Sequence, residues 1–336
     1  MKLNFSNNEF KNKAILDSNK INTYNFQHTN EEAFLVLIKD VESENLDNFC
    51  KYLCEKYDNS LNSLDYYEII QSNNIPDFLK NNLIASAYEC IDKYGNLGNK
   101  TIMEGKINTS SWISHSLYEA KVARNLANNL NLNTYIAFQM GLLHDIGRKQ
   151  SHSFDHVIKG YEYLASIGWN EEAISCLTHS FLKEFTSNSK KGGRFANCDP
   201  AEDGFNVDEN LIPYYSESYE KDDVSEFLEN YNYSIYDVIL NISDLIATDK
   251  GVVSPYERVE DIYTRKKPDE RNRTYFLNNF IHTLLYYLKL AGIIEDYPNM
   301  TTNDLDKSEE NFTLISDIFN NYCNILEINK KNNFLK

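Results

Sequence analysis

The segment SHSLYEAKVARNLANNLNLNTYIAFQMGLLHDIGR, residues 114–148, decides the fold. Its second half predicts a helix over residues 134–146 with an apolar middle, MGLL. Its first half spaces apolar side chains as one buried helix face does, at Leu117, Ala120, Ala123, Ala127 and Leu130. The segment therefore predicts two successive helices that end in a histidine–aspartate pair.

The helical period extends along most of the chain, while strand-like alternation is scarce. We therefore predict an all-α protein. A polar stretch with several Gly and Pro residues, 186–223, interrupts the pattern. The predicted helices cover residues 31–57 (as one or two helices), 76–94, 112–130, 134–146, 154–167, 171–185, 233–249, 275–294 and 312–328.

Composition excludes several classes of protein. The chain has 336 residues, 33 Lys and Arg against 50 Asp and Glu, and a formal charge of −17. This charge disfavours an extended nucleic-acid surface or an anionic membrane surface. The longest apolar run, AFLVLI at 33–38, is too short to span a bilayer, and the first residues lack the apolar stretch of a secretory signal. Six cysteines without a CxxC pair fit a reducing compartment, so we expect a cytoplasmic protein.

Five of the seven histidines fall within 65 residues, at His115, His144, His152, His156 and His179. Clustered imidazoles beside a carboxylate such as Asp145 are typical of a transition-metal site. The alternative is a set of hydrogen-bonded core histidines, which the number and order of the residues disfavour. His152 lies in a polar turn, where a surface position is the simpler interpretation.

A polar row runs along the predicted helix 233–249, beside an apolar stripe. Its members follow one another at helical spacing, at Asp237, Asn241, Asp244 and Thr248. Buried polar groups are costly unless they have partners. A metal ion would provide one for Asp244 and keep it ionised.

The ordered set H…HD…H…H…D, with the motif LLHDIGR, resembles the HD superfamily of metal-dependent phosphohydrolases. The resemblance covers roughly residues 111–262. It implies an HD-domain helical bundle with additional N- and C-terminal helices. It also implies a binuclear-type ligand set that projects inward from separate helices, made of His115, His144, Asp145, His156, His179 and Asp244.

In this family the ligands His115, His144, Asp145 and Asp244 would hold one metal, while His156 and His179 mark a second that Asp145 bridges. We expect one or two divalent transition metals, Fe, Mn, Co, Ni or Zn, with Mg²⁺ as an alternative. Such a site lowers the pKa of a bound water so that it can attack phosphorus. Asp145 is the candidate catalytic residue that orients this water.

Phosphate recognition requires cationic side chains near the ligands. Arg148 and Lys183 each follow a ligand histidine by one helical turn and are the candidates for both catalysis and substrate binding. Further candidates for substrate binding are Lys191, Arg194, Lys250 and Arg258.

We divide the chain into a mostly helical accessory region (1–100), an HD domain (101–265) with an insertion at about 186–231, and C-terminal helices (266–336). The insertion is expected to form a lid over the site. The predicted function is a phosphohydrolase or phosphodiesterase acting on a nucleotide or another small phosphorylated substrate, with no membrane or extended nucleic-acid partner. A homodimer is a further possibility. Two alternative functions also remain, an HD-type diiron oxygenase and a non-catalytic nucleotide-binding sensor.

Overall fold

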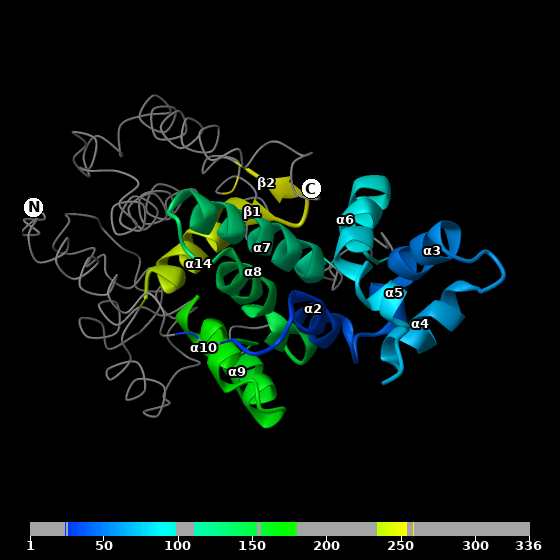
Figure 1. The fold of residues 1–336 in the computed structure, drawn as a ribbon, viewed down its shortest axis with the longest axis horizontal. Helices are drawn as coiled ribbons and strands as arrows, with labels where there is room; N and C mark the ends of the chain where they lie inside the picture. The colour runs from blue at the N-terminus through cyan, green and yellow to red at the C-terminus, as the bar shows by residue number, and fades with distance from the viewer. Residues whose placement is uncertain are drawn as a thin grey trace, which may run out of the picture.

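A computed structural model describes residues 24, 26–98, 111–152, 156–179, 234–253 and 258. The insertion at 186–231, the predicted helices 275–294 and 312–328 and the region 266–336 lie outside the described residues. The two-helix segment forms α7 (Ser111–Asn129) and α8 (Thr134–Leu143), which pack side by side at the centre of the molecule (Figure 1).

A glycine allows α7 and α8 to approach closely. A Cβ atom at Gly141 of α8 would lie 2.8 Å from both the Cα and the backbone nitrogen of Ala120 on α7. Only a residue without a side chain fits this distance. The end of α8, which carries the histidine–aspartate pair, is thereby held against α7.

Helix α14 (Ile235–Ile246) packs across both α7 and α8. The buried Ser234 caps its N-terminus by accepting hydrogen bonds from the backbone nitrogens of Tyr236 and Asp237. The helix continues into a short antiparallel pair, β1 (Ala247–Thr248) and β2 (Gly251–Val252), which lies along α7.

The chain leaves α8 through the 3₁₀ turn η2 (Ile146–Lys149) and then forms α9 (His156–Ser166) and α10 (Asn170–Thr178). A Cβ atom at Gly147 would lie 1.9 Å from the carbonyl oxygen of His156 and 2.5 Å from the nitrogen of Gly160. The backbone of the HDIG turn at Gly147 therefore lies directly against the backbone at the start of α9.

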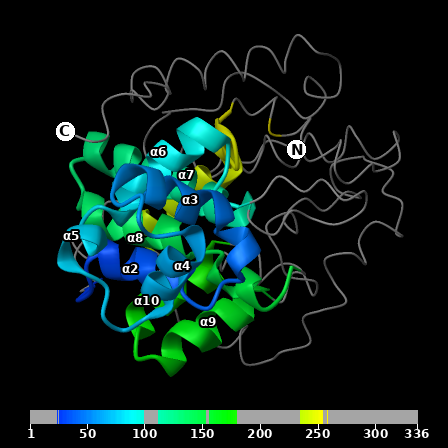
Figure 2. The same ribbon diagram turned by 90° about the vertical axis from the view of Figure 1, so that its right-hand side faces the viewer.

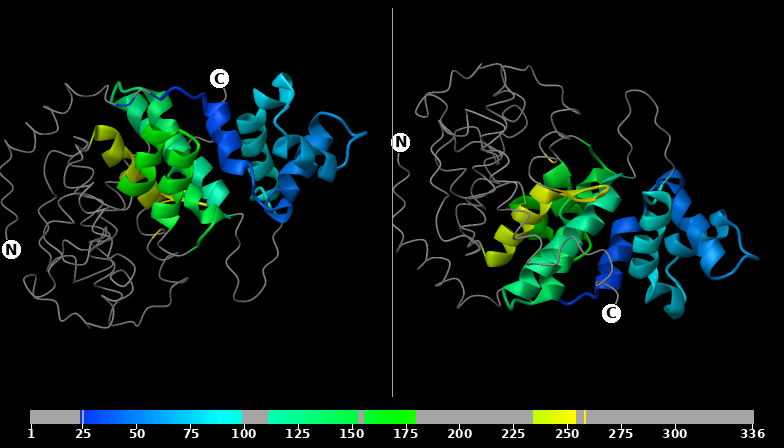
Figure 3. Two further views of the ribbon diagram at one scale, coloured as in Figure 1. Left: turned by 90° about the horizontal axis from the view of Figure 1, so that it is seen from below. Right: turned by 90° about the horizontal axis from the view of Figure 1, so that it is seen from above.

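The N-terminal part contributes α2 (Asn30–Ile38), η1 (Ser43–Asn45), α3 (Asp47–Lys56), α4 (Ser63–Gln71), α5 (Asp77–Lys80) and α6 (Leu83–Tyr94). Helix α2 packs on α8, and its buried residues belong to the same hydrophobic core as those of α7 and α8. Helices α3 to α6 gather at one end of α7, away from α14 (Figure 3), and they lie towards the viewer in Figure 2.

The all-α prediction is confirmed, since the only strands among the described residues are the two short ones after α14. Three details differ from the predictions. The helix predicted over 76–94 is two helices, α5 and α6, separated by Asn81 and Asn82. The helix predicted over 233–249 ends at Ile246, where β1 begins, and α4 was not predicted. None of the described helices is both long and apolar enough to cross a membrane.

Candidate metal centre

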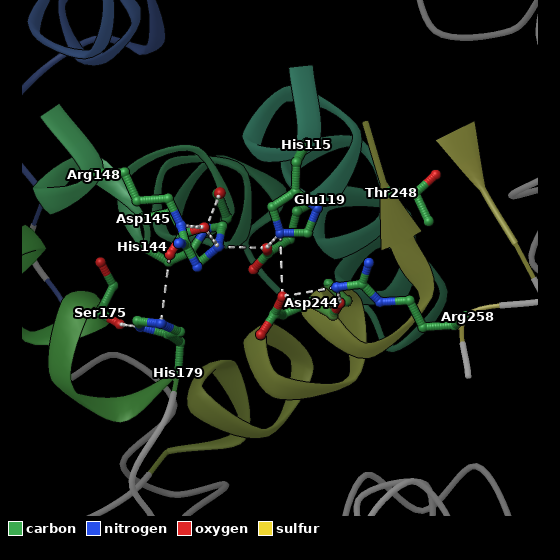
Figure 4. Close-up of polar contacts among 12 residues, drawn as sticks. His115, Glu119, His144, Asp145, Arg148, Ser175, His179, Asp244, Thr248 and Arg258 are labelled. Carbon is green, nitrogen blue, oxygen red and sulfur yellow. Dashed lines mark hydrogen bonds and ion pairs between the residues drawn. The ribbon is translucent and has the colours of Figure 1, made fainter. Parts of the chain in front are cut away.

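Seven buried or nearly buried side chains converge where α7, α8, α9, α10 and α14 meet (Figure 4). They form two groups, and within each group one ligand atom per residue lies within 4.8 Å of all the others. The first group is His115, Glu119, His144 and Asp244, and the second is Asp145, His156 and His179. The structure thus brings together all six residues that the sequence predicts as ligands and adds Glu119.

The first group surrounds the Nε2 atoms of two histidines. His115 Nε2 lies 3.2 Å from Asp244 Oδ1 and 3.5 Å from Glu119 Oε2. His144 Nε2 lies 2.9 Å from the same Glu119 oxygen. Two imidazoles from α7 and the end of α8 therefore face two carboxylates, one on α7 and one on α14.

The second group is centred on Asp145. Its Oδ1 atom lies 2.9 Å from His156 Nε2 and 3.8 Å from His179 Nε2. Its Oδ2 atom lies 3.5 Å from His144 Nε2, which belongs to the first group. One carboxylate therefore faces both groups, and this position is suited to a bridging ligand.

Backbone carbonyls fix how two of the imidazoles are presented. His144 Nδ1 lies 2.8 Å from the carbonyl oxygen of Gly141, and His179 Nδ1 lies 3.3 Å from that of Ser175. A carbonyl accepts only from a protonated nitrogen, so Nδ1–H donates and Nε2 is the nitrogen that faces the site. Histidine ligands are oriented in this way at metal sites.

Burial and neighbouring charges shift the pKa values of the cluster. Burial raises the pKa of Glu119 to about 8. Burial also acts on Asp145, but the charges of Arg148 and His144 outweigh it and hold the pKa of that carboxyl well below its usual range. The pKa of His144 is raised well above its usual value because Glu119 and Asp145 outweigh its burial.

Several atoms of the cluster lack hydrogen bonds. Both Glu119 carboxylate oxygens, His144 Nε2 and Asp145 Oδ1 are buried without a hydrogen bond of good geometry to any residue in the described part of the chain. Buried polar atoms without partners are costly. Imidazole nitrogens and carboxylate oxygens directed at common points are a donor set for a divalent transition metal, so the residues present fit such an ion.

The predicted phosphate-binding residues have different positions. Arg148 borders the second group, with Nε 2.5 Å from Asp145 Oδ2, and Arg258 Nη2 lies 4.0 Å from Asp244 Oδ1 in the first. Lys250 is exposed in the turn between β1 and β2, outside both groups. Lys183, Lys191 and Arg194 lie outside the described residues.

The predicted polar row runs from α14 into β1, and it has three structural members and one site residue. Asp237 accepts a hydrogen bond from Tyr24 at 3.0 Å, and Asn241 donates to the carbonyl oxygen of Thr178 at 2.9 Å. Thr248 donates to the carbonyl oxygen of Gly251 at 2.9 Å. Of the four, Asp244 alone belongs to a ligand group, and Figure 4 shows it pointing into the cluster while Thr248 points away.

The remaining described histidines lie outside the two groups. His28 stacks on Trp169 with ring centroids 3.8 Å apart, and its Nδ1 lies 2.9 Å from Glu172. This arrangement fastens the segment before α2 to the start of α10. His152 is exposed, in agreement with a surface position.

Glu119 is the site residue that sequence reasoning missed. It is fully buried on α7, one helical turn after His115. A glutamate inside a helix is usually exposed, so its residue type did not mark it as part of a buried site. The available signal was its position, since it directly precedes Ala120 on the predicted apolar stripe.

Comparison with protein families gives one match: residues 112–204 fit the model of the HD domain. The chain therefore carries an HD domain, as its ordered histidines and aspartates predict. HD domains are generally metal-dependent phosphohydrolases. Comparison with curated proteins and with solved structures gives no match. Asp244 lies beyond the matched residues, and only the packing of α14 brings it to the cluster.

Proposed function

We propose that the protein is a metal-dependent phosphohydrolase that cleaves a nucleotide or another small phosphoester. One observation carries this proposal: the six residues of the H…HD…H…H…D set come from α7, the end of α8, α9, the end of α10 and α14, and they meet in two adjoining groups. A role as structural core histidines does not explain why carboxylates and imidazoles accumulate around the same buried points.

The chain's own residues have distinct tasks in this reaction. A divalent cation, when bound, supplies Lewis acidity and lowers the pKa of a water molecule. Asp145 faces both groups and stays ionised, so it can accept a hydrogen bond from the attacking water and orient it. His156 and His179 fix the other side of the same carboxylate.

Two arginines would neutralise the charge that develops on the phosphoryl oxygens. The Arg148 side chain is 29% exposed and lies at the edge of the site. Arg258 lies next to Asp244 on the other side. Planar guanidinium groups bind phosphate oxygens in pairs, which suits a phosphoester. The overall charge of −17 favours a small substrate over a polynucleotide.

The test combines metal analysis with a phosphoester panel on the purified chain loaded with Mn²⁺, Fe²⁺, Co²⁺ or Ni²⁺. We expect bound metal and turnover of at least one nucleotide. The double variant His144→Ala/Asp145→Ala should lose both, whereas Lys93→Ala, which removes a surface lysine paired with Glu55, should keep both.

Other outcomes would point to the alternatives. Oxygen consumption with a mixed-valence iron EPR signal, and no phosphoester turnover, would favour a diiron oxygenase. Nucleotide binding without turnover by any metal form would favour a sensor. Full metal stoichiometry in the double variant would end the assignment of the site.

A further inference from the structure

We propose that Glu119 is a metal ligand of the first group, so that this pocket holds its cation with two imidazoles and two carboxylates. The inference rests on the proposed metal site but adds a residue that the H…HD…H…H…D set does not contain. The first pocket would then be formed by His115, Glu119, His144 and Asp244.

The position of Glu119 distinguishes a ligand from a residue that only orients a ligand. A carboxylate that orients a histidine ligand bonds the ring nitrogen facing away from the metal. In His144 that nitrogen, Nδ1, already lies 2.8 Å from the Gly141 carbonyl oxygen. Glu119 instead lies 2.9 Å from Nε2, the nitrogen that faces the site. Glu119 is therefore on the metal side of the ring.

The imidazole of His115, the other histidine of the first group, also places Glu119 on the metal side. Glu119 Oε2 also lies 3.5 Å from His115 Nε2, and that nitrogen lies 3.2 Å from Asp244 Oδ1. One carboxylate oxygen thus lies between the site-facing nitrogens of two predicted ligands. When these nitrogens turn their lone pairs to a cation, the Glu119 carboxylate lies beside the same cation and is placed to bind it.

Complete burial makes an ionised Glu119 costly unless a cation lies beside it. Glu119 has no exposed surface, and neither of its oxygens has a hydrogen bond of good geometry within the described residues. An ionised carboxylate in such a position needs a counter-charge. A divalent cation in the first pocket supplies that charge directly.

The two pockets then differ in charge. Two carboxylates neutralise a divalent cation in the first pocket, whereas Asp145 alone leaves a net positive charge in the second. The first pocket should accordingly bind its cation more tightly, so that metal loads in two steps. The second pocket, with Arg148 at its border, would keep the positive charge for an anionic substrate.

Stepwise Mn²⁺ titration of the chelator-treated full chain, with free Mn²⁺ measured by EPR, tests the inference. Glu119→Gln keeps the shape of the side chain and removes its charge. It should weaken the tighter binding step by more than about 100-fold, beyond the roughly 10- to 100-fold effect of a residue that orients a ligand. It should also change the visible absorption of the Co²⁺-loaded protein, which reports the number of ligands.

The matched control is Glu172→Gln, since Glu172 is also buried and paired with a histidine but lies outside the site. It should bind Mn²⁺ as the wild type does. Unchanged tight binding and an unchanged Co²⁺ spectrum in Glu119→Gln would overturn the inference.

Two further results keep the test decisive. If Glu119→Gln does not fold, a crystal structure of the Mn²⁺-loaded wild type replaces it. There a Glu119 oxygen should lie within about 2.0–2.3 Å of the ion, and a longer distance would reject the inference. Tight, Glu119-dependent metal binding without phosphoester turnover would reject the proposed function and leave the ligand assignment intact.

Discussion

Arg148 connects the metal ligands to the edge of the site. Its Nε atom donates a hydrogen bond to Asp145 Oδ2 at 2.5 Å, and its charge helps to keep the pKa of Asp145 low. The same side chain is partly exposed. One side chain can thus keep the carboxylate ionised and also meet a phosphate from solution.

Arg148→Ala should lower kcat/KM for the phosphoester by about 100-fold, the typical cost of removing one group that stabilises developing charge. Steady-state kinetics on the Mn²⁺-loaded variant measures this, and bound metal should remain. Arg148→Lys should recover little, because an ammonium cannot bind the carboxylate and a phosphate in the same planar geometry. Wild-type kinetics in Arg148→Ala would remove Arg148 from the reaction.

The six ordered ligand candidates were predictable as individual residues because histidine and aspartate in that order carry chemical meaning. Glu119 was not, since a helical glutamate is ordinary and its burial depends on the angle at which α7 meets α8 and α14. The roles of Asp237 and Asn241 were equally hidden. Their partners, Tyr24 and Thr178, are distant in the chain and adjacent only after folding.

At the scale of elements, two glycines set the spacing of the ligand-bearing helices. Gly141 brings α8 against α7, and Gly147 brings the HDIG turn against α9. The helical pattern predicted most of these elements. It could not predict their separation, because an approach between backbones leaves no periodic signal in the sequence.

Gly147→Ala should damage the second ligand group. The added Cβ would meet the His156 carbonyl oxygen, a backbone atom that cannot turn away, so α9 must move and carry His156 with it. We expect the weaker Mn²⁺ step to lose at least about tenfold in affinity, as for other losses of ligand orientation.

Gly168→Ala provides the comparison for this variant. Gly168 has a φ of 88° and nothing within 4 Å of an added Cβ. Alanine there should cost about 1–2 kcal/mol of stability from the left-handed conformation alone and leave metal affinity unchanged. Equal metal binding by both alanine variants would contradict the proposed role of Gly147.

At the scale of the whole molecule, the N-terminal helices and the HD domain share one hydrophobic core. Lys149, in the turn after the HDIG motif, strengthens this link. Its Nζ donates to the carbonyl oxygens of Val36 and Lys39 at 2.5 and 2.6 Å, at the end of α2. The position of α2 is thereby tied to the turn that carries Asp145.

Burial lowers the pKa of Lys149 from 10.5 to about 7. Between these values the unfolded chain binds more protons than the folded one, so this lysine makes folding more favourable as the pH rises. The difference in unfolding free energy between wild type and Lys149→Met should therefore increase by about 2 kcal/mol from pH 7 to pH 9. Denaturant titrations of the metal-free proteins at both pH values measure it, and a constant difference would show that Lys149 stays charged when folded.

The order of the ligands along the chain has a consequence for biosynthesis. The group Asp145, His156 and His179 is complete once α10 has left the ribosome, whereas the group containing His115 must wait for Asp244 on α14. During translation, all residues of the three-ligand group are therefore present well before those of the four-ligand group. The group containing His115 can bind a cation only after α14 has been synthesised. A cation bound there links α14, the last of these helices to be made, to α7, the first.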